Sequence, residues 1–100
     1  MDADHYNYML ELFKACQWEF KCLSENTRRQ ILMTLIEEGP LNVTQITDRT
    51  YLSQPAVSHH LKELRLACLV QMKPAGSENY YEALLDPFLQ KLKNIVTEFA

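Results

Sequence analysis

The sequence predicts a mainly helical fold with one small β-hairpin, and three observations support this prediction. Glycine is scarce, with only 2 residues in 100, whereas the good helix formers Leu, Glu, Lys and Gln are frequent. Apolar residues recur at helical spacing over 6–20, 53–67 and 86–99. Between residues 69 and 84 the pattern changes to that of two strands joined by a turn. We expect a single domain, 1–100, whose core needs neither disulfide nor structural metal.

The first half of the chain predicts three helices. The first covers 6–20, and Ser24 is a suitable N-cap for a second, which ends at the Gly-Pro pair 39–40. Asn42 with Gln45 three residues later forms a capping box that opens a short third helix. The stripe expected to face the core in the first helix consists of Tyr6, Met9, Leu10, Phe13, Cys16 and Phe20.

The second half predicts one more helix, the hairpin and a terminal helix over 86–99. Ser53 caps the fourth helix, and Pro55 stands in its first turn, where a missing N–H does no harm. Strands follow over 69–73 and 79–84. The buried stripe of the fourth helix consists of Val57, Leu61 and Leu64. A short helix, a tight turn, a capped helix and a hairpin make a winged helix-turn-helix, here in the order four helices, two strands, one helix.

The adjacent pair His59 and His60 allows three interpretations: metal ligands, a catalytic base, or side chains that contact a partner. Successive helical residues diverge by about 100°, so the two imidazoles do not easily share one metal. Glu63 lies four residues after His59, which makes a weak two-ligand site conceivable, but no third ligand is near. No partnered nucleophile or pocket is indicated, so the sequence does not favour a catalytic base.

The polar face of the fourth helix favours the third interpretation. With the apolar stripe turned inward, the outward side chains are Gln54, Ser58, His59 and Lys62. They offer the donors, acceptors and charge that base edges in a major groove require. A merely solvated polar face is the alternative. His60 lies at the edge of the apolar face, where a half-buried packing role is expected.

Four segments resemble the ArsR/SmtB family of dimeric winged-helix repressors: LSENTRRQIL (23–32), LNVTQIT (41–47), LSQPAVSHHLKELRLACLV (52–70) and NYYEAL (79–84). The resemblance implies that the helix 53–67 enters the major groove and that 74–79 reaches towards the DNA backbone. It also implies a DNA-reading unit over about 42–84 and dimerisation helices over about 6–20 and 86–99. By matching position, DNA would be contacted by Ser53, Gln54, Ser58 and His59, with Lys62 and Arg65 near phosphates.

The sequence departs from the family's usual pattern at two glycine positions and in the wing. Tyr51 and Cys68 stand where glycine is usual, so either they are held left-handed at a cost of about 1 kcal/mol or more, or the turns differ. The wing is poor in arginine, with Lys73 and an opposing Glu78. Better candidates for phosphate contacts, unless they are only solvated charges, are Arg28, Arg29, Arg49, Lys62 and Arg65.

The positions that bind metals in sensing members of the family carry other residues here. Asn42, Thr44 and Thr47 stand where cysteine ligands would be, and Phe88 and Phe99 replace histidines, although Asp86 matches. We therefore expect no metal site and no cofactor.

Cysteines offer a candidate thiol sensor instead. Cys16 and Cys22 are close in sequence, and Lys21 is expected to lower the pKa of Cys22. The alternative is that these cysteines, and Cys68, are simply packed.

Apolar residues beyond a single stripe predict a homodimer. Leu12, Trp18, Leu89 and Val96 would remain exposed in a monomer. The expected partners are a second copy and double-stranded DNA with a partly palindromic operator. We expect a cytoplasmic location, because no apolar run reaches the length of a membrane span and the N-terminal region is acidic.

The outward face of the fourth helix and the family resemblance together predict a homodimeric, sequence-specific DNA-binding transcriptional repressor that reads the major groove with the helix 53–67. The alternative is a winged-helix module that binds another protein and has weak or no DNA binding, which the formal net charge of −3 favours. An enzyme is not expected, because no nucleophile–base pair, phosphate loop or metal cluster is visible in the sequence.

Overall fold

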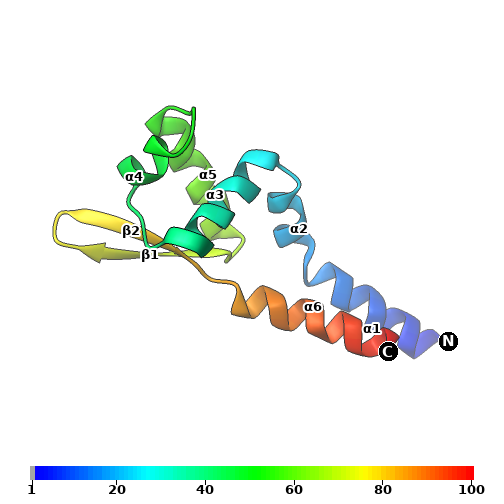
Figure 1. The fold of residues 1–100 in the computed structure, drawn as a ribbon. Coiled ribbons are helices and arrows are strands. Elements are labelled where there is room, and N and C mark those ends of the chain that lie inside the picture. Colours follow the sequence, from blue (N-terminus) through cyan, green and yellow to red (C-terminus); the bar gives the residue numbers. More distant parts are fainter. Residues whose placement is uncertain (1) are drawn as a thin grey trace.

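The computed structural model describes residues 2–100 and confirms a mainly helical fold with an antiparallel hairpin (Figure 1). The elements, in chain order, are α1 (Ala3–Lys14), α2 (Gln17–Leu23), α3 (Asn26–Glu38), α4 (Val43–Asp48), α5 (Gln54–Leu66), β1 (Val70–Ala75), β2 (Glu78–Ala83) and α6 (Asp86–Phe99). Helices α3, α4 and α5 form a body with the hairpin at its side. The predicted winged helix-turn-helix is therefore present.

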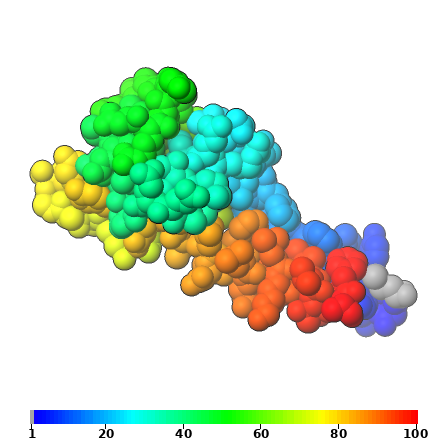
Figure 2. Space-filling view, viewed as in Figure 1, coloured from blue at the N-terminus to red at the C-terminus, as the bar shows by residue number. Residues whose placement is uncertain are grey.

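Helices α1 and α6 form an arm that projects from this body (Figure 1; Figure 2). They run antiparallel side by side, so that the start of α1 and the end of α6 lie together at the tip of the arm (Figure 1). The Phe13 and Phe99 rings meet edge to face, with their centroids 6.3 Å apart. The molecule measures 54 × 23 × 19 Å, and its radius of gyration is 16.1 Å. A compact domain of this length has a radius of gyration of about 13 Å. The arm therefore extends beyond a compact body, and each of its two helices is covered only on the side that faces the other helix.

The predicted single helix over 6–20 is wrong, because it is broken into α1 and α2 between Lys14 and Gln17. The break is supported from α6: the Lys91 ammonium donates to the Ala15 carbonyl at 2.9 Å and pairs with the Glu19 carboxylate at 2.7 Å. Glu19 is only 4% exposed. Five helices therefore precede the hairpin instead of four, and α2 turns towards the body while α1 follows α6.

The stripe predicted to face the core over 6–20 is also largely wrong. Of its six residues only Met9 and Cys16 are buried. The other four are exposed: Tyr6, Leu10, Phe13 and Phe20. An apolar face that was expected to pack inward instead lies on the outside of the arm.

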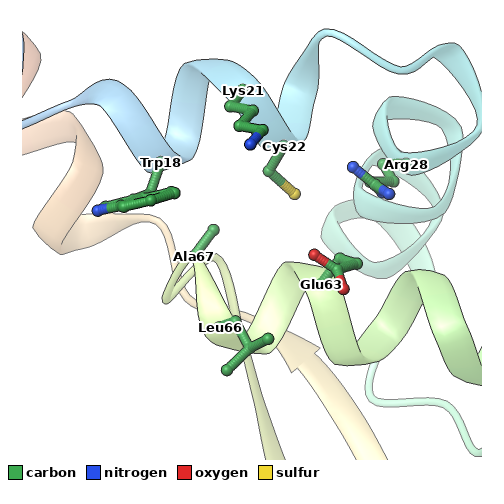
Figure 3. A pocket seen from close by; sticks show the side chains of 7 residues that line it. All are labelled: Trp18, Lys21, Cys22, Arg28, Glu63, Leu66 and Ala67. Carbon is green, nitrogen blue, oxygen red and sulfur yellow. The ribbon is translucent and has the colours of Figure 1, made fainter.

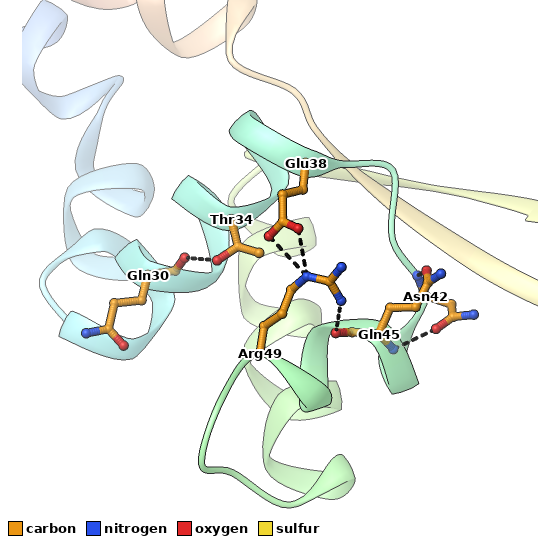
Figure 4. A network of polar contacts seen from close by, with 6 residues as sticks. All are labelled: Gln30, Thr34, Glu38, Asn42, Gln45 and Arg49. Atoms are coloured by element: carbon orange, nitrogen blue, oxygen red, sulfur yellow. Dashed lines mark hydrogen bonds and ion pairs between the residues drawn. The ribbon is translucent and has the colours of Figure 1, made fainter.

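Of the caps predicted for α3 and α4, the one for α4 is present and the one for α3 is not. Ser24 does not cap α3; it ends α2, where its hydroxyl donates to the Lys21 carbonyl at 2.7 Å, and Glu25 takes the N-cap position of α3. The capping box of α4 is present (Figure 4): the Gln45 N–H donates to Asn42 Oδ1 at 2.8 Å, and the Asn42 N–H donates to Gln45 Oε1 at 2.9 Å.

The hairpin pairs Val70 with Ala83 at its base and Ala75 with Glu78 at its tip, within two residues of the predicted strands. Gly76, with φ of 62°, supplies the left-handed conformation that the tight turn requires. The hairpin is fixed to the body by a bridge between Leu41 and Tyr81. The most deeply buried side chains of the core, all less than 2% exposed, include Ile31, Ile46, Val57, Leu61, Leu64 and Leu69. The predicted buried stripe of the fourth helix is therefore confirmed.

Candidate nucleic-acid interface

Helix α5 is held rigidly at its start and along its inner face. Ser53 has an extended backbone, and its hydroxyl accepts from the Ala56 N–H at 3.3 Å, as the predicted N-cap requires. Val57, Leu61 and Leu64 are fully buried. Helix α4 packs against α5. The outer face of α5 is consequently presented by a fixed scaffold.

All six side chains predicted to contact DNA are exposed on or beside this face: Ser53, Gln54, Ser58, His59, Lys62 and Arg65. The Gln54 amide donates weakly to the Thr44 hydroxyl at 3.3 Å, which joins the starts of α4 and α5. Within residues 2–100, no side-chain hydrogen bond or ion pair engages Ser58, His59, Lys62 or Arg65. Their donors and acceptors are therefore free for a ligand outside the protein.

His60 lies on the inner edge of α5, as expected for a half-buried packing residue. Its Nδ1 accepts from Arg28 Nε at 3.4 Å, and its Nε2 lies 3.5 Å from a Glu25 carboxylate oxygen. The His59 and His60 ring centroids are 5.6 Å apart and the rings are tilted by 54°. This contact between α3 and α5 was missed, because its partners are 32 residues apart and nothing in the local sequence pairs them.

Metal ligation by the histidine pair has little geometric support. His59 is exposed and His60 faces Glu25 and Arg28. Across residues 2–100, no three His, Cys, Asp or Glu side chains are grouped so that they could hold a metal ion. The histidines therefore fit roles in packing and outward contact better.

Three of the arginines proposed for phosphate contacts are held by the protein itself. Arg28, whose side chain is 16% exposed, pairs with Glu25 at 3.2 Å in addition to its contact with His60. This leaves its guanidinium facing the interior of the α2–α3–α5 junction, so the expectation that it contacts phosphate is not supported.

Arg49 and Arg29 are likewise engaged. Arg49 Nε lies 2.9 Å and 3.0 Å from the two Glu38 carboxylate oxygens, and its Nη1 donates to the Gln45 carbonyl at 2.7 Å (Figure 4). Arg29 donates to the Leu23 carbonyl at 2.7 Å. Beside it the Thr34 hydroxyl donates to the Gln30 carbonyl at 2.9 Å, a bond that is ordinary within a helix (Figure 4).

On the outer face of α5, the positive charges that lack an internal partner among residues 2–100 are therefore Lys62 and Arg65. In the wing, the Lys73 ammonium lies 2.7 Å from a Glu82 carboxylate oxygen. That hydrogen bond lowers the pKa of Glu82. The expected opposition of Lys73 and Glu78 is wrong, because Lys73 pairs in register with Tyr80 and Glu78 lies at the tip. The expectation of a weak wing is consistent with this neutralised lysine.

The two usual glycine positions behave differently. Cys68 has φ of 58°, so it is held in the left-handed conformation, and it is the one non-glycine residue between 2 and 100 with a positive φ. Tyr51 has a negative φ and its side chain is fully exposed. The first alternative therefore holds at Cys68, and a different turn is used at Tyr51.

The candidate thiol sensors lie in the interior. Cys16 is 0% and Cys22 5% exposed, and burial raises the pKa of both thiols. The expected lowering of the Cys22 pKa by Lys21 is wrong, because the Lys21 ammonium lies over the Trp18 ring, 5.8 Å from its centroid. Reactive thiols are accessible and have a lowered pKa, so the structure favours packed cysteines.

Of the residues predicted for a dimer interface, some are exposed and one is not. Leu89 and Val96 are 51% and 66% exposed on α6. Leu12, in contrast, is partly buried and packs against the core, so its assignment to the exposed surface is wrong. Trp18 is exposed, as predicted.

Comparison with known proteins now identifies the family. Residues 25–71 match the family of bacterial regulatory proteins described as the arsR family. The chain is 33% identical over 88 residues to an arsenical resistance operon repressor of Staphylococcus aureus, and the match covers 85% of this chain and 84% of that repressor. The chain belongs to the arsR family. This confirms the resemblance noted in the sequence.

Other members support the same assignment. An arsenic resistance transcriptional regulator of Pseudomonas putida is 39% identical over 62 residues, which is 62% of this chain, and this ArsR-family chain spans 48% of that regulator's length. The structure of an ArsR-like transcriptional regulator from Rhodococcus superposes with a TM-score of 0.75 at 28% identity, over 87% of this chain and 84% of the other. The protein is accordingly a winged helix-turn-helix transcriptional regulator and not an enzyme.

Among residues 2–100, no helix is both long enough and apolar enough to cross a bilayer.

Proposed function

We propose that this ArsR-family protein is a homodimeric repressor that binds a partly palindromic operator and reads the major groove with α5. The observation that carries the proposal is the outer face of α5, where Ser58, His59, Lys62 and Arg65 are exposed and free of internal contacts on a helix fixed by its N-cap and buried stripe. Side chains in this state bind base edges and phosphates without first breaking bonds within the protein.

Dimerisation is supported by the arm. Besides Trp18, which lies where α2 meets α5, eight large apolar or aromatic side chains of α1, α2 and α6 are exposed: Tyr6, Tyr8, Leu10, Phe13, Phe20, Leu89, Val96 and Phe99. Exposure of so many large apolar side chains is unusual on a soluble monomer. Burial across a two-fold axis removes them from water and places two copies of α5 for half-sites about 34 Å apart, one helical turn of DNA.

Repression is inferred from relatives such as the Staphylococcus aureus operon repressor. A regulator bound at an operator blocks transcription by occupying the promoter, and this requires no further activity of the chain. A cytoplasmic location is part of the proposal, because that is where such an operator would be met.

A protein-interaction module is the second candidate, and two observations favour it. The net charge is −3, and Arg28, Arg29 and Arg49 are held by internal contacts. Against it, the acidic residues Asp2, Asp4 and Glu11 lie on the arm, away from α5. The local electrostatic field over the outer face of α5 is therefore set by Lys62 and Arg65.

The test is fluorescence anisotropy with duplex DNA from just upstream of the protein's own coding region, compared with a scrambled duplex of the same composition. We expect tighter binding to the upstream duplex. If Lys62 and Arg65 of two protomers each neutralise one phosphate, log Kd should change with log salt concentration with a slope of magnitude about 3 to 4. No binding to any upstream fragment at low salt would favour the interaction module.

A further inference from the structure

A cavity of about 280 Å³ opens where α2, α3 and the last turn of α5 meet (Figure 3). It lies on the opposite end of α5 from the N-cap. Helix α2 supplies Trp18, Lys21 and Cys22, and α5 supplies Glu63 and Leu66. None of these residues belongs to the outer face proposed to contact DNA. The cavity is therefore a second surface on the helix that reads DNA.

One side of the cavity is apolar and aromatic. The Trp18 indole and the methyl groups of Leu66 and Ala67 lie at this side, and the Cys22 thiol points into the middle (Figure 3). Trp18 is 60% and Leu66 68% exposed, which is a large exposure for two apolar side chains that line the same cavity. A planar ring that binds at this side covers apolar surface that is otherwise in contact with water.

Charged groups of both signs also border the cavity. The Lys21 ammonium lies over the Trp18 ring, 5.8 Å from its centroid, and neither Lys21 nor Glu63 has an ion-pair partner within 4.0 Å anywhere in residues 2–100. Arg28 is fixed at the cavity wall by Glu25 and by the ring of His60. One held cation, one free cation and one free carboxylate thus border the same hollow (Figure 3).

From this arrangement we infer that the cavity binds a small aromatic amino acid, or a molecule with the same three parts. The ring lies against Trp18 and Leu66, the carboxylate faces Lys21 and Arg28, and the ammonium faces Glu63. The volume is at the lower limit of the range of about 300–1,000 Å³ that small-molecule sites occupy, so the ligand holds no more than one ring system and a short polar chain. A zwitterion pairs with all three charged groups. An acid that lacks the ammonium leaves Glu63 without a partner, and an amine that lacks the carboxylate leaves Lys21 and Arg28 without one.

Occupancy of the cavity regulates DNA binding, and this part of the inference rests on the proposed function. The ligand would join α2, which follows directly from α1 of the arm, to the C-terminal turn of α5. The arm is where the proposed dimer forms, so a change at this junction alters the position of α5 relative to its copy in the partner. The spacing of the two reading helices, and with it operator affinity, would then depend on the ligand.

The binding step can be tested without DNA, because Trp18 is the only tryptophan of the chain. Its fluorescence is followed at one protein concentration while L-phenylalanine is added, with 3-phenylpropionate and phenethylamine as analogues that lack the ammonium and the carboxylate. We expect saturable change with L-phenylalanine, with a dissociation constant between about 1 μM and 1 mM. Each analogue should bind about tenfold or more weakly, because one charged contact is lost.

Variants locate the site. Glu63→Gln should weaken L-phenylalanine about tenfold and leave 3-phenylpropionate unchanged or tighter, and Lys21→Met should weaken both. Glu37→Gln, on the exposed side of α3, is the matched control and should have no effect. Far-ultraviolet circular dichroism verifies that each variant folds. No response to L-phenylalanine at millimolar concentration, equal binding of all three compounds, or equal loss in the control would overturn the inference.

The regulatory step is tested separately by the anisotropy assay on the upstream duplex with and without saturating L-phenylalanine. A change in operator affinity of about fivefold or more, which in Glu63→Gln requires about tenfold more L-phenylalanine, is the expected result. A ligand that binds by fluorescence and leaves DNA affinity unchanged would overturn the regulatory step alone. Failure of the protein to bind DNA at all would contradict the proposed function and leave the fluorescence result standing.

Discussion

Replacement of Lys91 by methionine should destabilise the protein because it leaves a buried carboxylate without its partner. The Glu19 side chain is 5% exposed and lies 2.7 Å from the Lys91 ammonium, which is itself on a side chain 40% exposed. Loss of one partner from a fully buried pair costs about 3–5 kcal/mol. Water can reach this carboxylate once the lysine is gone, which reduces the expected cost to about 2–3 kcal/mol. The Ala15 carbonyl also loses its donor.

The opposite change, Glu19→Gln, should cost less, about 1–2 kcal/mol, because the amide oxygen still accepts from Lys91 and the ammonium still reaches both Ala15 and solvent. Urea unfolding at one fixed protein concentration measures both variants, with the exposed and unpaired Lys62→Met as the control for the loss of a lysine. A cost for Lys91→Met equal to that of the control, or smaller than that of Glu19→Gln, would refute the reasoning.

The pairing of Lys91 with Glu19 also determines how the stability that Lys91 contributes should depend on pH. The hydrogen bond to Glu19 raises the pKa of Lys91 above its ordinary value of 10.5. A raised pKa contributes stability that is fully present below the ordinary value and is lost as pH rises through the folded one. The difference between wild type and Lys91→Met should therefore be constant near neutral pH and shrink only in strongly alkaline solution.

Three further predictions concern the turn, the arm and the wing. Cys68→Gly should stabilise the fold by about 1 kcal/mol, since glycine adopts its φ of 58° without strain, whereas Cys68→Ala should not; equal thermal midpoints for the two would contradict this. Leu89→Glu should shift the sedimentation coefficient towards that of a monomer and weaken DNA binding in parallel, and a wild-type monomer that binds its operator tightly would refute the dimer. Lys73→Met should raise the pKa of Glu82 in a nuclear magnetic resonance titration, and an unchanged value would show that the pair does not form in solution.

The elements that could be predicted from the sequence are those whose boundaries depend on neighbouring residues. The capping box at Asn42 and the N-cap at Ser53 act within one turn, and both are present where the sequence places them. The break after Lys14 has no glycine or proline to mark it. It depends on Lys91, more than seventy residues away, so no local pattern reports it.

In the candidate site, too, some features follow from neighbouring residues and others depend on contacts between distant ones. The outward face of α5 follows from helical periodicity, and His59 and Lys62 lie where that periodicity places them. The charges are different, because an arginine free for phosphate and one held by the protein look alike in sequence. Arg49 is held by the Glu38 carboxylate and the Gln45 carbonyl, whereas Arg65 is not held, and the contact with Glu38 is a consequence of how α3 and α4 pack.

The most direct test of DNA reading by α5 compares Ser58→Ala and His59→Ala with wild type on the upstream duplex and on the scrambled duplex. Both side chains are exposed and make no side-chain hydrogen bond or ion pair within residues 2–100, so we expect their removal to leave folding unchanged. Each variant should lose about 1–3 kcal/mol of binding free energy on the upstream duplex and little on the scrambled one. Equal losses on the two duplexes, or no loss on either, would contradict the claim that this helix reads sequence.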